Sequence, residues 1–510
     1  MTDILNALKR ERWSAAAFGI AGFAVTLIQV VAFHRLAGHS DAERAAFGYA
    51  LSLEATAGAV LFPTPEHLDT VGGYLQLRAF SLLAVLFASW ALLSATRSGA
   101  PRPVVRSAAF ALAAAVAATA ACAGVLVGVA LTGETIGTAG LFEAGLLLVA
   151  LAAACYALCM VVTQLTPAAT LVAGALLTAL YFLNSLSRVF TERGAARWLS
   201  PFSYYDLSSA TGLAVLIAIA VAATGLAAFL SRRPSRAATM LSPHSFEPSR
   251  SPLLAVPVTR ALYPQRYTYA AWCVAFVILG VVLVAAARAS MRDILSLPRL
   301  LPGLRQYLFV FYAQVLGQTW FQVTLLLLVA LVFAFVAGWA AQDGDGRLEA
   351  QLSATYSRSA VVLERLAALA CATTVFTALS GLAVVLTSLA EDLTLDIAHV
   401  VSAVIVLVVF SVMLGGAGSL LTSWAPRVAP ALFGGFVLAS YLDNQVGAAL
   451  GLPGWAQTLS PFRLVGAPLA NGIHARNLAL MLLLAVAGLG TSILLMQRRD
   501  VGTSSPAYQR

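Results

Sequence analysis

Long apolar runs alternate with short polar segments along the whole chain. A helix needs about 20 residues to cross a hydrocarbon core roughly 30 Å thick, and each run is long enough to do so. We therefore predict an all-α polytopic membrane protein with about twelve transmembrane helices. The predicted spans are 13–34, 75–96, 107–132, 140–163, 168–187, 210–231, 267–287, 316–341, 361–389, 397–423, 428–448 and 477–497.

The segment between the sixth and seventh predicted spans differs from the rest of the chain. Residues 232–266 carry six prolines and six arginines and have no helical apolar period, which is typical of a linker. We expect a first six-helix transmembrane repeat at 1–231, a cytoplasmic Pro/Arg-rich linker at 232–266 and a second six-helix transmembrane repeat at 267–510.

The two halves share short motifs in the same order, at an offset of 260 residues. The matching pairs are Tyr181-Phe-Leu-Asn184 with Tyr441-Leu-Asp-Asn444, and Leu199-Ser-Pro-Phe202 with Leu459-Ser-Pro-Phe462. Several matches in register indicate a duplication. Each copy has an even number of predicted spans, so we expect the copies to lie in the same orientation and to enclose a central pathway.

Composition and charge also indicate a membrane protein, and they bear on its topology and cellular location. Of the 510 residues 60% are hydrophobic and only 10% are charged, which excludes an ordinary soluble or disordered chain. Most of the 31 Lys and Arg lie in loops beside spans, so the net charge of +9 indicates membrane topology rather than a nucleic-acid partner. With the N-terminus inside, 19 of them are inside and 12 outside. We expect a multi-pass protein of the bacterial cytoplasmic (inner) membrane with both termini cytoplasmic.

Lys9 is the only lysine of the chain. A P-loop needs a lysine after a glycine-rich turn, because its ammonium group reaches the terminal phosphates, and no such turn precedes Lys9. The six histidines are scattered among loops and span ends, and the five cysteines show neither disulfide nor metal-ligand spacing. We therefore predict that the chain is not an enzyme and has no catalytic site, metal site or cofactor of its own.

The loop between the eighth and ninth predicted spans runs from Asp343 to Arg358. It opens with a flexible acidic turn, Asp343-Gly-Asp-Gly, and continues into a short helix-forming stretch that ends with a basic residue. Two interpretations fit this spacing. One is a surface helix that docks on a partner, and the other is a solvated connector between spans.

The same loop resembles the Glu-x-x-Leu…Ser-Arg signature of the permeases of ABC-2-type ABC transporters. The matching residues are Glu349, Leu352, Ser357 and Arg358. Thr355 stands where the family usually has proline. In the first half Pro103 and Arg106 are similar to the end of the signature, but Arg97 occupies the position of an expected acidic residue. The resemblance implies that these segments are ATPase-coupling helices with unequal contacts on a separate ATPase.

Further features strengthen this resemblance: Leu-Ser-Pro-Phe before each last span, a long outer loop after the first span, and the closing Arg498-Arg499-Asp500. Two fused six-span repeats resemble the actinobacterial exporters related to tetronasin and other antibiotic efflux permeases. The resemblance implies partnership with an ABC ATPase subunit in two copies. ATP and Mg²⁺ are then bound by that partner, and the substrate is an amphipathic small molecule.

In that family the second and fifth spans of each half line the pathway, and a short re-entrant helix pair precedes each sixth span. The pathway-lining candidates are Gln314, Gln318, Gln322, Tyr181, Asn184, Tyr441 and Asn444. The outer-gate candidates are Pro201, Phe202, Tyr204, Tyr205, Trp455, Pro461 and Phe462. The three glutamines share one helix face, and interhelical hydrogen bonding explains them equally well. An interfacial aromatic belt is the alternative for the gate residues.

These observations predict a transmembrane permease that exports amphipathic compounds, drugs, antibiotics or lipid-like molecules, with ATP hydrolysed by a separate subunit. The alternative is an ion-gradient-driven secondary transporter with twelve spans. Such a transporter needs a membrane-embedded ionisable coupling site, and the middles of the predicted spans are nearly free of charge. Membrane lipid is the expected surrounding in both cases.

Overall fold

The helices of this chain form two units in the computed structural model, Met1–Glu247 and Pro248–Arg510. The boundary between them falls within the predicted linker. The structure describes residues 2–57, 65, 67–96, 102–166, 169–189, 196–207, 209–232, 256–263, 266–295, 316–344, 347–353, 357–391 and 395–499, and these residues contain no strand. The all-α class is confirmed for this part of the chain.

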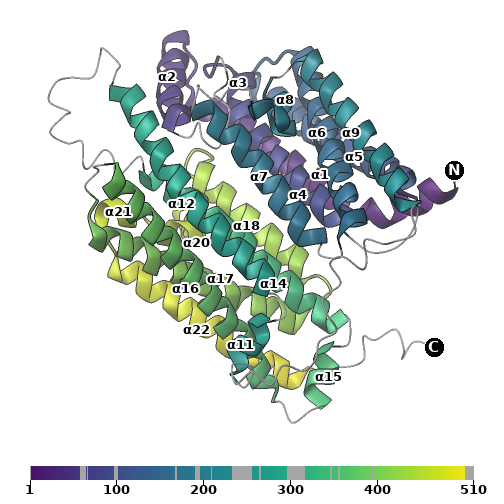
Figure 1. Ribbon diagram of the computed structural model, residues 1–510. Coiled ribbons are helices and arrows are strands. Elements are labelled where there is room, and N and C mark those ends of the chain that lie inside the picture. The colour runs from purple at the N-terminus through teal and green to yellow at the C-terminus, as the bar shows by residue number, and fades with distance from the viewer. Residues whose placement is uncertain are drawn as a thin grey trace. The chain divides into compact units, whose positions relative to one another are not determined.

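The first unit begins with one long helix, α1, and its last element is α9 (Figure 1). Its elements are α1 (Thr2–Leu36), α2 (Asp41–Ala57), α3 (Val71–Leu75), the π turn η1 (Gln76–Phe80), α4 (Ser81–Ala95), α5 (Pro103–Thr132), α6 (Thr138–Leu165), α7 (Ala169–Val189), the 3-10 turn η3 (Ala196–Leu199), α8 (Pro201–Asp206) and α9 (Ala210–Ser231). Proline begins α5 and α8, a position where its missing N–H has no helical partner to lose.

Small residues bring α1 and α5 together in the first unit. The buried stripe of α5 is rich in alanine, and a Cβ atom at Gly22 would lie 3.1 Å from the Cβ of Ala121. At the same crossing Thr26 Oγ1 donates to the carbonyl of Ala121 at 2.8 Å. Close packing and buried hydrogen bonds hold membrane helices together, because lipid tails leave no hydrophobic driving force between them.

The second unit contains a short helix that the sequence did not predict, α11, inside the expected linker. Its elements are α11 (Pro257–Leu262), α12 (Arg266–Leu295), the π turn η7 (Gly317–Phe321), α14 (Gln322–Gly344), α15 (Arg347–Ser353), α16 (Arg358–Ala390), α17 (Ile397–Trp424), α18 (Ala429–Val446), α19 (Gly454–Thr458), α20 (Pro461–Val465), α21 (Pro468–Asn471) and α22 (Ala475–Arg498). Arg260 of α11 pairs with Glu364 of α16 at 3.6 Å. The end of the linker therefore packs on the second unit.

In the second unit α17 and α22 lie against each other over much of their length (Figure 1). Backbone approaches backbone where they cross, because a Cβ atom at Gly488 would lie 2.9 Å from the carbonyl carbon of Gly416. Ser492 Oγ lies 2.7 Å from the hydroxyl of Ser419 and 2.8 Å from that of Ser423. Glycine and serine thus join these two helices closely.

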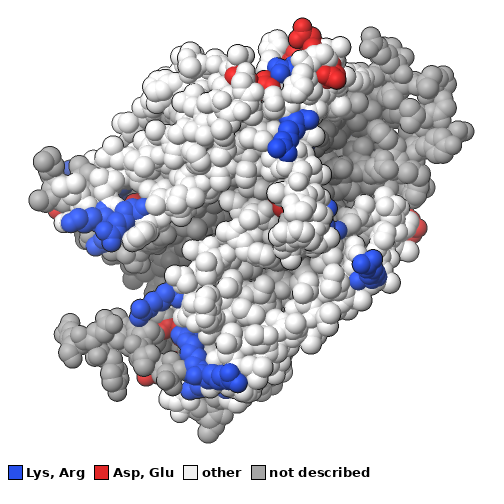
Figure 2. Space-filling view, turned by 180° about the vertical axis from the view of Figure 1, so that it is seen from behind, with Lys and Arg blue, Asp and Glu red and all other residues white. Residues whose placement is uncertain are grey.

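Ten of the described helices are long and apolar enough to cross a membrane. The two predicted spans outside this group, 168–187 and 428–448, are the fifth spans of the two halves. They fold as α7, whose apolar stretch is Val172–Ser185, and as α18, which carries Asp443 and Asn444 near its end. The chain is a multi-pass membrane protein, and Figure 2 shows its charged side chains in small groups on a largely uncharged surface.

Candidate functional site

Each unit has two ends with different chemistry. The short-helix end carries the short helices before the last span, η3 and α8 in the first unit and α19 to α21 in the second. The arginine end carries the first turn of α5, with Arg106, in the first unit and the first turn of α16, with Arg358, in the second. The outer-gate candidates lie at the short-helix ends, and the coupling candidates lie at the arginine ends.

The repeated motif residues make the same aromatic contact in both units. The ring of Phe202 meets Tyr181 edge to face at 5.3 Å between centroids, and the ring of Phe462 meets Tyr441 in the same way at 5.7 Å. Both phenylalanines are only 5% exposed, and a buried proline precedes each of them, Pro201 and Pro461. The Ser-Pro-Phe sequence therefore docks α8 on α7 in the first unit and α20 on α18 in the second.

A polar network completes this contact in the first unit. Asn184, which is 2% exposed, donates from Nδ2 to Asp206 Oδ2 at 2.7 Å. The hydroxyl of Ser203 donates to Asn184 Oδ1 at 2.7 Å. Asn184 therefore holds α8 against α7, and neither Ser203 nor Asp206 was among the residues predicted from the sequence.

Tyr205 links α8 to the second span. Its hydroxyl donates to the carbonyl of Phe80 at 3.1 Å, and Phe80 is the last residue of η1. Burial raises the pKa of Tyr205, and the neighbouring charge of Asp206 raises it further, so the phenol remains a donor. The neighbouring Tyr204 donates to the carbonyl of Trp198 at 2.8 Å. A π turn is wider than an α-helical turn and is often found at functional sites.

A cavity of about 350 Å³ lies beside this contact in the first unit. The start of the second span with its π turn, the first turns of α6, and α8 form its walls. Its polar lining residues are Gln76, Glu143, Tyr205 and Asp206. All its lining residues belong to the first unit, and they include two carboxylates but no lysine or arginine. The cavity therefore has negative charge beside apolar walls such as Phe80.

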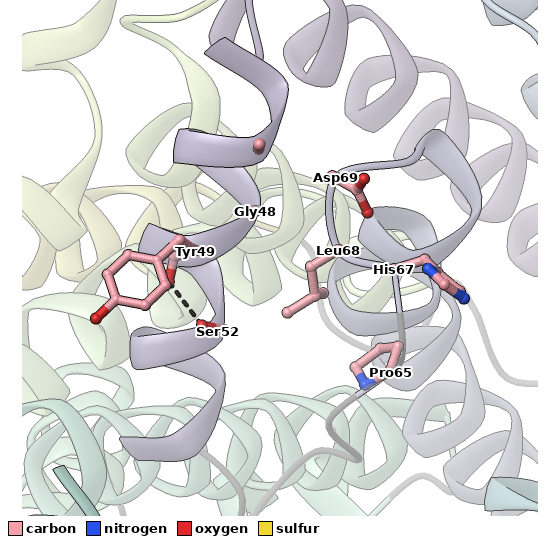
Figure 3. Close-up of a pocket in the computed structure, with 8 residues that line it drawn as sticks. Gly48, Tyr49, Ser52, Pro65, His67, Leu68 and Asp69 are labelled. Atoms are coloured by element: carbon pink, nitrogen blue, oxygen red, sulfur yellow. Dashed lines mark hydrogen bonds between the residues drawn. The ribbon is translucent and has the colours of Figure 1, made fainter. Parts of the chain in front are cut away.

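A second hollow of about 350 Å³ lies between α2 and the turn before α3 (Figure 3). The hydroxyl of Ser52 donates to the carbonyl of Tyr49 at 2.7 Å, within α2. His67, on the facing turn, has a φ of 58°, which is unusual for a residue other than glycine. The rings of Tyr49 and His67 point away from each other, so the polar groups of this hollow do not converge (Figure 3).

Asp443 distinguishes the short-helix end of the second unit. Both of its carboxylate oxygens are buried, and they have no hydrogen-bond partner among the described residues. The carboxylate packs against Gly447, where any Cβ atom would collide with it. A buried polar group without a partner is costly, so Asp443 requires an explanation beyond packing.

Asp443 and Ser460 were not among the residues predicted from the sequence, whereas Asn444, Trp455 and Pro461 were. Ser460, which precedes Pro461, donates from its hydroxyl to the carbonyl of Ser440 at 2.8 Å. Asn444 is half-buried. Trp455 is 70% exposed, an environment that also suits the interfacial aromatic belt.

At the arginine end of the second unit, Arg358 caps the last turn of α22. Its Nη1 lies 3.3, 2.9 and 2.7 Å from the carbonyl oxygens of Met496, Gln497 and Arg499. A guanidinium group at a helix C-terminus satisfies carbonyls that have no helical partner and complements the helix dipole. Arg358 therefore fastens the beginning of α16 to the end of α22.

Two further arginines belong to this end and were not among the coupling residues predicted from the sequence. Arg499 pairs with Asp343 and donates to the carbonyl of Thr422 at 3.3 Å. Arg365 donates to Gln342 Oε1 at 3.0 Å. The signal that points to Arg365 is its place inside an apolar run, where a charge needs a partner.

The helix α15 buries one face and exposes the other. Leu348 is 1% exposed and Leu352 is half-buried, whereas Glu349 is exposed. Ser357 begins the next helix, because its hydroxyl accepts a hydrogen bond from the N–H of Ala360 at 3.2 Å. The predicted coupling segment is thus a short docked helix followed by a capped long helix.

The arginine end of the first unit has a similar cap. Pro103 is the first residue of α5, and Arg106 Nη2 donates to the carbonyls of Ser94 and Ala95 at 3.3 and 3.0 Å. Arg106 therefore caps the end of α4 much as Arg358 caps α22. Arg97 lies outside the described residues.

The predicted glutamine stripe falls on the π turn η7. Gln314 lies outside the described residues, Gln318 lies within the π turn, and Gln322, the first residue of α14, is half-buried. A π turn holds more residues than an α-helical turn, so a spacing of four no longer equals one turn. Trp320 Nε1 donates to Ser380 Oγ at 2.9 Å and ties this turn to α16.

Comparison with known families points to one class of protein. Residues 254–496 match the family model described as multidrug efflux system permease Rv1217c, C-terminal domain. The matched segment lies entirely within the second unit and includes Arg358, Asp443 and Phe462. None of the curated proteins matches the chain. The second unit is therefore similar to multidrug efflux permeases, and this similarity fits a permease of the ABC type for drug export.

Proposed function

We propose that this chain is the transmembrane permease subunit of an ATP-driven exporter of amphipathic compounds. The observation that carries the proposal is the match of residues 254–496 to the C-terminal domain of a multidrug efflux permease. A separate ABC ATPase, in two copies, binds ATP and Mg²⁺ and supplies the energy. The chain resides in the cytoplasmic membrane with its arginine ends inside and its short-helix ends outside.

The arginine end of the second unit supports the coupling step. The exposed Glu349 of α15 is available to a partner, and Arg358 fastens the following helix to α22. Closure of the ATPase dimer against α15 moves α16 and α22 together through this cap. ATP must stabilise one state of the permease more than the other, and unequal contacts with α15 in the two states provide that difference.

Copurification tests this proposal. The chain is isolated gently from its native membranes, its companions are identified, and vanadate-sensitive ATP hydrolysis is measured with and without amphipathic compounds. We expect a stoichiometric P-loop ATPase and stimulated hydrolysis. Arg358→Gln should uncouple hydrolysis from transport, and Arg476→Gln, at the exposed start of α22, is the matched control. A chain that comes out alone and moves solute on an ion gradient would contradict the proposal.

Asp443 favours a second candidate, the ion-gradient-driven transporter. An ionisable side chain whose oxygens are buried without a partner among the described residues, near the end of a predicted span, is the kind of group that such transporters use for coupling. Uptake into proteoliposomes separates the candidates. Transport by the chain alone that follows a proton gradient and is lost in Asp443→Asn supports the second candidate, whereas transport that needs the ATPase supports the first.

A further inference from the structure

The cavity at the short-helix end of the first unit has the size and chemistry of a ligand site. Its volume of about 350 Å³ lies in the range of small-molecule pockets, which is about 300–1,000 Å³. Phe80 and Leu147 supply buried apolar walls, and they are 5% and 2% exposed. Such pockets combine an apolar lining with a few convergent polar groups that orient the ligand.

The two carboxylates of the cavity differ in their hydrogen-bond partners. Asp206 accepts a hydrogen bond from Asn184 and is held in place. Glu143, half-buried on α6, has no hydrogen-bond or ion-pair partner among the described residues. A carboxylate beside an apolar surface is stabilised by a cation that donates hydrogen bonds. Glu143 therefore leaves one charge of this cavity uncompensated within the described part of the chain.

The remaining polar groups suit a donor with several hydrogens. Gln76, the first residue of the π turn, carries an amide oxygen, and Tyr205 of α8 carries a phenol oxygen; both kinds of oxygen accept hydrogen bonds. An alkylammonium group has three donors and no acceptor, so carboxylate, amide and phenol oxygens together satisfy it. An anionic ligand would meet two carboxylates without any lysine or arginine in the lining.

We propose that this cavity binds the amine end of an amphipathic cation, with Glu143 as its main ionic partner and Phe80 and Leu147 against its apolar part. The inference rests on the proposed function, because it assigns a substrate class to the exporter. It places a recognition site within the first unit, at the contact between η1, α6 and α8.

The glycine at position 140 provides a direct test of occupancy. Gly140 lines the cavity on the first turn of α6, and a Cβ atom there meets nothing within 4 Å. Gly140→Leu therefore adds a bulky side chain at the wall of the cavity, at a helical position that accepts one. Gly225→Leu on α9, where a Cβ atom also meets nothing within 4 Å, is the matched control. For the charge, Glu143→Gln is compared with Asp41→Asn, which is exposed on α2.

The experiment measures binding to the full chain in nanodiscs without any ATPase. The probes are dansylcadaverine, a fluorescent amphipathic amine, and its N-acetylated form, which has the same apolar part without the charge, with empty nanodiscs as background. We expect the amine to bind about tenfold more tightly than the acetylated probe, as one charge-assisted hydrogen bond provides. Glu143→Gln should remove this preference, Gly140→Leu should weaken both probes, and the two controls should change neither.

Equal binding of the two probes, no detectable binding of the amine, or amine binding unchanged in both Glu143→Gln and Gly140→Leu would overturn the inference. These outcomes are separable from failure of the proposed function. Amine binding that depends on Glu143, in a chain that never copurifies with an ATPase, would support the binding site and contradict the ATP-driven exporter. An ATPase partner with stimulated hydrolysis, together with probe binding independent of Glu143, would support the exporter and contradict the binding site.

Discussion

The short-helix ends of the two units differ in their polar contacts. In the first unit the amide of Asn184 is hydrogen-bonded to both Ser203 and Asp206. In the second unit Asp443, the neighbour of Asn444, has carboxylate oxygens with no partner among the described residues. Both units nevertheless pack a phenylalanine edge to face on a tyrosine. The same aromatic pair therefore joins a short helix to a long one in both units. The polar residues around it differ between the units, and this difference gives the two short-helix ends different chemistry.

The largest expected effect tests the shared part of this comparison. Phe202→Ala and Phe462→Ala each remove a side chain that is 5% exposed and leave a cavity against the fifth long helix. We expect each to lower the free energy of unfolding by about 3–5 kcal/mol. Denaturant unfolding in mixed micelles measures both. A large loss in one unit and none in the other would show that the motif does not stabilise the two units equally.

The next effect separates the two units. Asn184→Leu leaves the hydroxyl of Ser203 and the carboxylate of Asp206 without their amide partner, and we expect a loss of about 2–3 kcal/mol. Asn444→Leu changes a half-buried residue, so we expect a loss within about 0.5 kcal/mol. The same unfolding assay applies. Equal losses would show that the polar network of the first unit contributes no more than its counterpart.

The two aspartates should respond with opposite sign. Asp443→Asn removes a buried charge that has no partner, so we expect a gain in stability of about 1–2 kcal/mol. Asp206→Asn weakens a charge-assisted hydrogen bond from Asn184, so we expect a loss of about 1–2 kcal/mol. A destabilised Asp443→Asn variant would mean that the carboxylate has a partner in the folded protein, such as a bound cation.

The arginine ends should differ less. Arg358 faces three carbonyl oxygens at the end of α22, and Arg106 donates to two at the end of α4. We expect Arg358→Gln and Arg106→Gln each to cost about 1 kcal/mol, because each cap satisfies terminal carbonyls and complements a helix dipole. Hydrogen exchange in the last turns of α22 and α4 locates the loss. Exchange that rises elsewhere instead would contradict the capping role.

The smallest effect concerns α2 of the first unit and depends on pH. The N–H and hydroxyl of Ser40 and the N–H of His39 donate to Glu43, and these bonds hold the pKa of Glu43 below its ordinary value of 4.5. A lowered folded-state pKa means that the stabilisation is present above the unfolded value and is lost as the pH falls through the folded value. The protection factors of the amides in the first turn of α2, each corrected for the intrinsic exchange rate at the pH of the measurement, should therefore fall on acidification below that value. In Glu43→Gln these protection factors should be low at neutral pH already and should not fall further on acidification.

Most of the fold was predictable from the sequence because apolar run length and membrane thickness together determine a spanning helix. Ten described helices match predicted spans, and α7 and α18 lie where the remaining two were expected. The short helix α11 was missed, because its stability comes from contact with α16 and the Arg260 ion pair rather than from its own periodicity. The π turns were missed because no simple sequence period marks them.

The candidate site was only partly predictable. The repeated motifs located Tyr181, Phe202, Tyr441 and Phe462, and the structure brings each pair into contact. The family signature placed Arg358 at a coupling helix, which stays a prediction, but only the structure revealed its bonds to the end of α22. Contacts between residues far apart in the chain, such as that of Tyr205 with the carbonyl of Phe80, depend on helix packing that no local pattern encodes.

The single helix α22 connects the arginine end of the second unit to its short-helix end. Its 24 residues, at about 1.5 Å each, make a rod about 36 Å long. Arg358 holds its last carbonyls, α20 packs beside it, and the glycine contact with α17 stiffens it along its side. Such a rod has low mechanical compliance, so a displacement applied at one end reaches the other as a tilt of one rigid body, with little lost to bending.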